Sequence, residues 1–517
     1  MSENSRVTRA AGVVGAATLL SRIFGFARDV VIAWFFGAGL SADAFFVAFR
    51  IPNLLRRLFA EGSLTIAFIP VFTDYMTHHG KDEAFHLARA ALRMLSLILI
   101  CVSVLGVLFA PLIVRIVAPG FADSPEKLSL TVFLTRIMFP YVFFICLAAL
   151  CMGILNVFRH FAAPAIAPVL LNIAMILSVF LISPYTDKPV TGLAAGVIIG
   201  GILQLALQFP FLIKKGFYFW QKAGIYHSGL KKIGILMLPA VFGATVHQIN
   251  IIVGTLLASL LPQGSVSYLY YADRLVEFPL GIFAISIATA ILPSLSQQAS
   301  AKDFNALRHT FSYAMKLVFF ITIPSMVGLI VLREPIIALL FKRGAFDSQT
   351  TRLTAEALLY YSIGLWAFSG VRIVVSTFYA LQDTKTPVKI AFVSVIANIV
   401  LGILLMGPML HGGLAVATAL ASMLNFGLLV YALRRRIGAL EWREIVNSVC
   451  KSLICALMMG VAVQALAFLI IPSKDGSIIG FFSGLMVSIV AGCGFYVFFA
   501  FLLRSRELDD VLKMIRR

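Results

Sequence analysis

Residues 42–62 read ADAFFVAFRIPNLLRRLFAEG, an apolar run that carries charges at Asp43, Arg50, Arg57 and Glu61. Spacings of seven, seven and four place these four residues on one face of a helix. A charge at bilayer depth costs at least about 2.5 kcal/mol unless it faces a polar cavity or a partner. We therefore expect a membrane-embedded helix whose charged face serves a charged substrate.

The composition of the whole chain agrees with a membrane protein. The 517 residues are 60% hydrophobic and only 13% charged, and their mean hydropathy is +0.97, which is far too apolar for a soluble globule. At about 20 apolar residues per spanning helix, the sequence predicts an all-α polytopic protein with about 14 transmembrane helices. They lie near residues 12–36, 42–76, 89–113, 129–156, 162–183, 191–213, 233–260, 265–298, 309–332, 352–380, 387–406, 412–433, 449–471 and 477–503.

The distribution of Lys and Arg predicts the orientation. The connections 37–41, 261–264 and 407–411 contain neither residue, whereas the N-terminus, the 214–232 connection and the 504–517 tail are basic. Because basic residues remain on the cytoplasmic side, both termini are expected there. The net charge of +19 then reflects this bias and contact with anionic lipid, and we expect no nucleic-acid partner.

Two parts of the sequence resemble each other. Thr191-Gly192-Leu193-Ala194 is followed by Gln204 and Lys214, and Gly412-Gly413-Leu414-Ala415 is followed by Asn425 and Arg435, at a constant offset of 221. Pro52 and Pro279 match at an offset of 227. About six helices separate equivalent points, which predicts two parallel six-helix lobes around a central cavity. The expected division is 1–216, 217–440 and a final helix pair with its cytoplasmic tail at 441–517.

Further charges complete a predicted cationic site. Arg22 and Asp29 are seven residues apart, Arg28 lies beside them in the first apolar run, and Asp273, Arg274 and Glu277 lie in the eighth. The guanidinium of arginine forms two parallel bonds to phosphate oxygens, which favours a phosphate or pyrophosphate ligand. Two structural explanations stay open: Arg57 and Glu61 are spaced for an ion pair between helical turns, and Arg50 and Arg56 could snorkel to the interface.

The sequence gives no sign of a metal or cofactor. All six cysteines lie in apolar runs without a CxxC spacing, and no nucleotide-binding GxxxxGK[ST] run occurs. A membrane enzyme would need clustered carboxylates or histidines at a membrane face. The nearest set, Asp74, His78, His79 and Asp82, is typical of a solvated turn. We expect no cofactor, no bound metal and no catalytic residue.

Several motifs resemble one known family. They are SRIFGFARD at 21–29, GAG at 37–39, ADAFFVAF at 42–49, IPNLLRRLFAEG at 51–62, YYADRLVEFP at 270–279 and YALQDTKTP at 379–387. Together they resemble the MurJ (MviN) lipid II flippase family over essentially the whole chain. The resemblance implies the MATE-like fold of the multidrug/oligosaccharidyl-lipid/polysaccharide exporter superfamily, with the final helix pair forming a groove for a lipid tail.

The resemblance also implies a substrate and a site. It implies that lipid II, an undecaprenyl-pyrophosphate-linked peptidoglycan precursor, crosses a bacterial inner membrane by alternating access without enzymatic chemistry, driven by the membrane potential. Membrane lipids and proteins of cell-wall synthesis and division are the implied partners. The residues implied to contact the headgroup or to act in gating are Arg22, Arg28, Asp43, Arg56, Arg57, Glu61 and Arg274.

Two other transporters share parts of this pattern. A flippase for another polyprenyl-linked oligosaccharide would bind the same pyrophosphate, and only the family motifs separate it from a lipid II flippase. A cation-coupled drug antiporter of the same fold would favour buried carboxylates over arginines. The basic site therefore argues against the antiporter.

Overall fold

The computed structural model describes residues 3–221, 224–471 and 478–515, which form helices and no strand. Contacts divide the chain into two compact units, Met1–Gly264 and Ser265–Arg517, and each is described by itself. The all-α class predicted from composition is confirmed. Helices are the expected result, because in lipid every backbone N–H and C=O group needs a partner within the protein.

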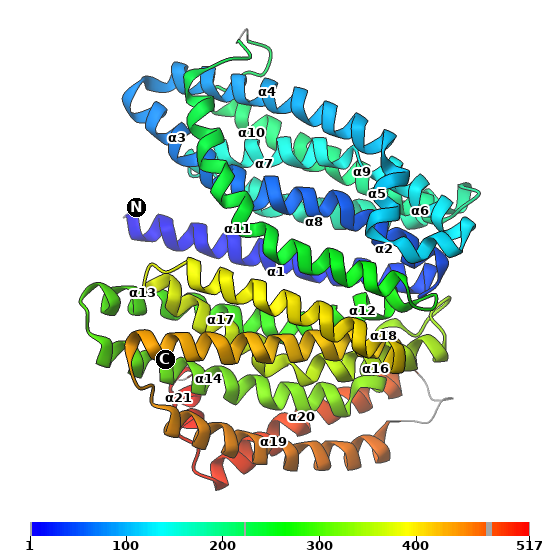
Figure 1. The fold of residues 1–517 in the computed structure, drawn as a ribbon, viewed down its shortest axis with the longest axis vertical. Helices are drawn as coiled ribbons and strands as arrows, with labels where there is room; N and C mark the ends of the chain where they lie inside the picture. The colour runs from blue at the N-terminus through cyan, green and yellow to red at the C-terminus, as the bar shows by residue number, and fades with distance from the viewer. Residues whose placement is uncertain (1–2, 222–223, 472–477, 516–517) are drawn as a thin grey trace. The chain divides into compact units, whose positions relative to one another are not determined.

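The first unit begins at the N-terminus and ends after α11 (Figure 1). Its elements are α1 (Glu3–Phe36), α2 (Leu40–Leu55), the π-helix η1 (Arg56–Leu64), α3 (Thr65–His78), α4 (Gly80–Leu108), α5 (Ala110–Val117), η2 (Pro119–Asp123), α6 (Pro125–Met138), α7 (Tyr141–Val157), α8 (Ala162–Leu181), η3 (Ser183–Tyr185), α9 (Val190–Ala206), α10 (Gln208–Lys214) and α11 (Ser228–Ser259).

The second unit contains the remaining helices. They are α12 (Ser265–Pro279), the π-helix η4 (Leu280–Ala284), α13 (Ile285–Ser300), α14 (Phe304–Val331), α15 (Arg333–Phe341), α16 (Ser348–Ile363), α17 (Leu365–Ala380), α18 (Lys385–Ile437), α19 (Trp442–Ile470), α20 (Ile478–Leu502) and α21 (Arg506–Ile515).

The helices account for every predicted span. Among the described residues, nine helices are long and apolar enough to cross a membrane, and α16 with α17 forms a tenth span bent by 43°. The long α18 contains two predicted spans, because Leu410 leaves the helical conformation (φ 49°, ψ −132°) just after Pro408. Adding α1, the α2–η1–α3 segment and α11 gives fourteen segments in the described chain, as the sequence predicts.

Glycines bring α9 into close contact with α8 and η3 in the first unit. A Cβ atom on Gly192, Gly196 or Gly200 of α9 would lie 2.5 Å from Ser183 N, 2.0 Å from Ser178 Oγ and 2.6 Å from Leu171 Cδ1, respectively. No side chain fits at those distances. The four-residue spacing puts the three glycines on one helix face, the small-residue arrangement by which membrane helices approach each other.

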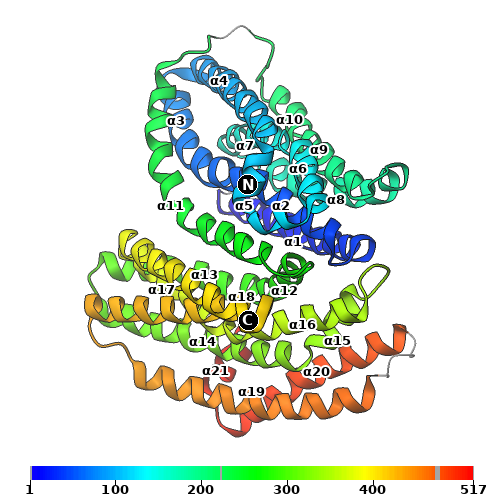
Figure 2. The same ribbon diagram turned by 45° about the vertical axis from the view of Figure 1, so that its right-hand side comes forward.

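The C-terminal pair α19 and α20 lies side by side in the second unit (Figure 2). It is attached to α14 by contacts of α19 and by a hydrogen bond from Tyr496 Oη to Phe320 O of 2.8 Å. Outward-facing apolar side chains such as Phe468, which is 85% exposed, give the pair a surface suited to lipid.

Proline precedes a π-helix in both units. Pro52 lies four residues before η1 and Pro279 directly precedes η4, and each π-helix is flanked by α-helices. Proline has no N–H for the helical ladder, which favours a local change of hydrogen bonding. Both units therefore share the order α-helix, π-helix, α-helix at a proline.

The contacts place α11 in the first unit, where it packs against α3 and η1. Units defined by contacts between residues do not test lobes that were predicted from a sequence repeat. The lobes 1–216 and 217–440 with the final segment 441–517 stay predictions.

Candidate substrate-binding site

Arg28 of α1 is held by two partners within the first unit. Its Nε and Nη2 donate to Asp29 Oδ1 at 3.0 and 2.7 Å, and its Nη1 donates to Asn172 Oδ1 of α8 at 3.1 Å. Asn172 Nδ2 in turn donates to Ser21 O of α1 at 3.2 Å. With side chains only 11% and 3% exposed, Arg28 and Asp29 form a nearly buried ion pair. The packing of α8 on α1 therefore fixes the orientation of this guanidinium.

Asp43 of α2 lies in a buried network. Its Oδ2 accepts from Lys127 Nζ of α6 at 2.7 Å and from Gly264 N at 2.8 Å, and its side chain is 1% exposed. Lys127 Nζ also lies 4.0 Å from the centre of the Phe121 ring, a cation–π contact. Asp43 thus ties α2 to α6 and to the end of the connection that follows α11.

Two other arginines have neutral partners. Arg50 Nη1 donates to Thr255 Oγ1, a fully buried hydroxyl of α11. Arg56 donates from Nε and Nη2 to Asn53 Oδ1, at 3.0 and 2.8 Å. The hydroxyl and amide oxygens accept these bonds and so help to orient the two guanidinium groups.

The predicted stripe does not stay in one environment. Asp43 faces α6, whereas Arg50 reaches α11. From Arg56 onward the chain is π-helical, so the α-helical spacing that linked Arg57 to Glu61 no longer applies. Arg57 is half-buried, and the Glu61 side chain lies outside the described residues. Arg22 is exposed on α1.

Arg274 lies in α12 of the second unit. Its Nη1 forms an ion pair with Glu277 Oε2 at 2.7 Å, and its Nη2 donates a hydrogen bond to Tyr270 Oη at 3.3 Å. The guanidinium carbon lies 4.9 Å from the centre of the Tyr270 ring. Glu277, which the sequence analysis placed in the same run as Arg274, is its ion-pair partner.

Three residues in these contacts were not predicted from the sequence. Lys127, Asn172 and Thr255 are 84, 144 and 205 positions away from their partners. An amide and a hydroxyl in apolar helices carry no signal of their own, and Lys127 stands beside Glu126 at the start of a helix, where a solvated charge is ordinary. The packing of helices brings them to the charges.

Solved structures of the same fold define the class of protein. An inward-facing multidrug resistance MATE family transporter of the MOP superfamily has a TM-score of 0.67 at 14% identity, and the match covers 83% of this chain and 98% of that one. The chain therefore has the fold of that structure. A structure described as lipid II flippase MurJ in an inward closed conformation has a TM-score of 0.79 at 29% identity, covering 95% of this chain and 99% of that chain.

Sequence comparisons then give the family. A family model described as "Lipid II flippase MurJ" matches residues 32–474. A probable lipid II flippase MurJ from Vibrio cholerae is 41% identical over 433 residues, 82% of each chain, and a lipid II flippase MurJ from Burkholderia cenocepacia is 39% identical over 432 residues, covering 83% of this chain and 84% of that one. The chain belongs to the MurJ family. It is a transporter and a multi-pass protein of the bacterial inner membrane.

Proposed function

We propose that this protein moves lipid II from the cytoplasmic to the periplasmic leaflet of the inner membrane. Membership in the MurJ family supports the substrate. The observation that carries the proposal at the level of residues is Arg28, a nearly buried guanidinium held by Asp29 and Asn172 inside an apolar helix. A buried arginine in a membrane helix marks a substrate pathway by default.

The arginines have the chemistry that a pyrophosphate needs. A guanidinium presents five N–H donors in a planar fork that matches two phosphate oxygens. Arginine is cationic at physiological pH, so Arg50 and Arg56, which Thr255 and Asn53 help to orient, attract an anionic headgroup. Asn172 and Tyr270 orient Arg28 and Arg274, respectively. Arg22, Arg57, Asp43 and Glu61 complete the proposed set.

Alternating access is the proposed mechanism, with the membrane potential as its driver. The headgroup is anionic, and moving one charge through 100 mV is worth about 2.3 kcal/mol, so an inside-negative potential favours outward movement. The polyprenyl tail stays in lipid, and the exposed apolar surface of α19 and α20 is suited to it. We propose that both termini lie in the cytoplasm. We also propose that the protein contacts membrane lipids and proteins of cell-wall synthesis and division.

Rescue of cells depleted of their own lipid II flippase tests this function. Wild type is expected to restore growth, whereas Arg28→Ala and Arg274→Ala are expected to fail although they reach the membrane in equal amounts. Arg434→Ala serves as the matched control, because Arg434 is an exposed arginine at the end of α18. Rescue by both site variants would mean that these arginines only stabilise the structure. Failure of the wild type would favour another lipid-linked oligosaccharide or a drug as the substrate.

A further inference from the structure

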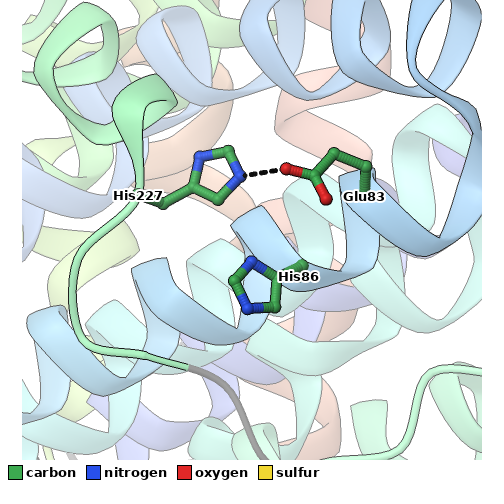
Figure 3. Close-up of side chains that lie close together, drawn as sticks. All are labelled: Glu83, His86 and His227. Carbon is green, nitrogen blue, oxygen red and sulfur yellow. Dashed lines mark hydrogen bonds and ion pairs between the residues drawn. The ribbon is translucent and has the colours of Figure 1, made fainter.

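Three potential metal ligands that are not among the proposed substrate-binding residues meet in the first unit. Glu83 and His86 lie in the first turns of α4, and His227 directly precedes α11 (Figure 3). One ligand atom from each lies within 4.8 Å of those of the other two. His227 Nε2 and Glu83 Oε1 are 2.9 Å apart, and the rings of His86 and His227 have centroids 5.5 Å apart.

The ligand types favour a particular ion. Glu83 and His86 are three residues apart on a helix, which directs both side chains to the same side. Two imidazoles and one carboxylate form the ligand set of zinc sites that keep a fourth position for water. Mg²⁺ and Ca²⁺ prefer oxygen ligands, so they suit this set poorly. His227 is 5% exposed and fixed, whereas Glu83 is 48% exposed, which gives water access and lets the carboxylate move to close the distance.

A metal ion at His227 would change which ring nitrogen carries the proton. Its Nδ1 accepts a hydrogen bond from Gly229 N at 3.1 Å, so the ring proton lies on Nε2 and points at Glu83. An ion bound to Nε2 requires the single proton of the neutral ring to move to Nδ1. The N–H group on Nδ1 would then face the N–H group of Gly229. The hydrogen bond by which His227 caps α11 would be lost.

We propose that Glu83, His86 and His227 bind one Zn²⁺ ion and that binding loosens the first turn of α11. Zinc binding would join the connection before α11 to α4. In exchange, α11 would lose the hydrogen bond that caps it. The site uses none of the proposed substrate-binding residues, so it stands independently of the transported lipid.

Zinc binding is measured on the full chain in detergent, purified with a tag that contains no histidine and stripped with a chelator. Wild type is expected to take up one Zn²⁺ per chain in competition with a chromogenic chelator. His86→Ala and Glu83→Gln are expected to weaken binding at least tenfold; the glutamine still offers an oxygen to His227 but no charge. Two nearby histidines serve as matched controls. His79 stacks on Tyr75, and His78 Nδ1 lies 3.0 Å from Asp74 Oδ1. His79→Ala and His78→Ala are expected to bind Zn²⁺ like wild type.

Hydrogen exchange separates the two halves of the proposal. Addition of Zn²⁺ is expected to speed exchange of the Gly229 amide in wild type and to leave it unchanged in His86→Ala. Zinc uptake that is absent, or equal in all variants, overturns the site. Uptake of one ion with unchanged exchange at Gly229 overturns the coupling to α11.

Discussion

The role of each charged residue in the membrane depends on the residue to which it is hydrogen-bonded. Asp43 and Arg50 are seven positions apart in one apolar run, yet Asp43 accepts from Lys127 of α6 and Arg50 donates to Thr255 of α11. A charge in an apolar run is visible in the sequence, so Arg28, Asp43 and Arg274 could be predicted as special. Their roles could not be assigned, because Asn172 and Lys127 come from distant helices.

The buried ion pair of Asp43 and Lys127 gives the first prediction. Lys127→Met is expected to destabilise the protein by about 3–5 kcal/mol, because it leaves a carboxylate buried without its cation. Adding Asp43→Asn should recover most of this loss, since the new amide oxygen still accepts from Gly264 N. Thermal unfolding in one detergent measures both variants.

A partly exposed ion pair provides the comparison. Lys316 pairs with Glu444 at 2.9 Å, and Glu444 is 57% exposed. Lys316→Met should cost only about 0–1 kcal/mol, as exposed ion pairs do. Equal unfolding midpoints for Lys127→Met and Lys316→Met would contradict a special role for the buried pair.

At the scale of elements, the packing of α8 and α9 gives the second prediction. Gly196→Ala would place a Cβ 2.9 Å from Met175 Cα as well as against Ser178, so the helices must separate. We expect a loss of about 1–3 kcal/mol, the usual cost of overpacking. Gly234→Ala in α11 is the control, because nothing lies within 4 Å of the new atom. An unfolding midpoint for Gly196→Ala equal to that of Gly234→Ala would show that the glycine contact is dispensable.

The connection before α18 gives a prediction on pH. Burial raises the pKa of Asp383, but hydrogen bonds from Thr386 and Lys385 and the nearby Arg436 lower it by more, so the pKa lies below its ordinary value of 3.8. A lowered pKa in the folded state means that the charged carboxylate stabilises the fold above pH 3.8 and that this stability is lost as the pH falls through the folded pKa.

Asp383→Ala tests this sign. Asp383 Oδ1 accepts from the first two backbone N–H groups of α18, Lys385 N and Thr386 N, at 3.1 and 3.0 Å. Losing this cap should cost about 1 kcal/mol at neutral pH. The unfolding midpoints of wild type and variant should approach each other as the pH falls below 3.8. A constant difference down to the acid limit would mean that the Asp383 charge contributes nothing.

Helix boundaries could be predicted from the sequence where helix-breaking residues such as proline occur. The break predicted at 407–411 is confirmed by the non-helical Leu410, next to Pro408. The π-helical conformation of η1 was not predicted, because hydrophobic periodicity separates apolar from polar faces but does not report whether a turn is α or π. Glu83, His86 and His227 were missed for another reason: the chain brings His227 back to α4 only through the tertiary fold.

At the scale of the whole molecule, the number of spans predicts topology. An even count of fourteen predicts that both termini lie on the same side, and the Lys and Arg bias predicts that this side is the cytoplasm. Green fluorescent protein fused to either terminus should fluoresce, and alkaline phosphatase fused there should be inactive. Alkaline phosphatase inserted at 407–411 is the positive control. Activity of the C-terminal alkaline phosphatase fusion, with a fluorescent N-terminus, would require an odd number of spans.

The two π-helices allow rotation within a continuous helix. A π turn bonds residue i to i+5 instead of i+4, so conversion of one such turn to α changes the register by one residue. One residue corresponds to about 100° around the axis of an α-helix. Conversion within η1 would turn Arg56 and Arg57 relative to α3 by about that angle without unwinding either flanking helix. The segment can therefore act as a swivel that re-aims two cations while the span stays in the membrane.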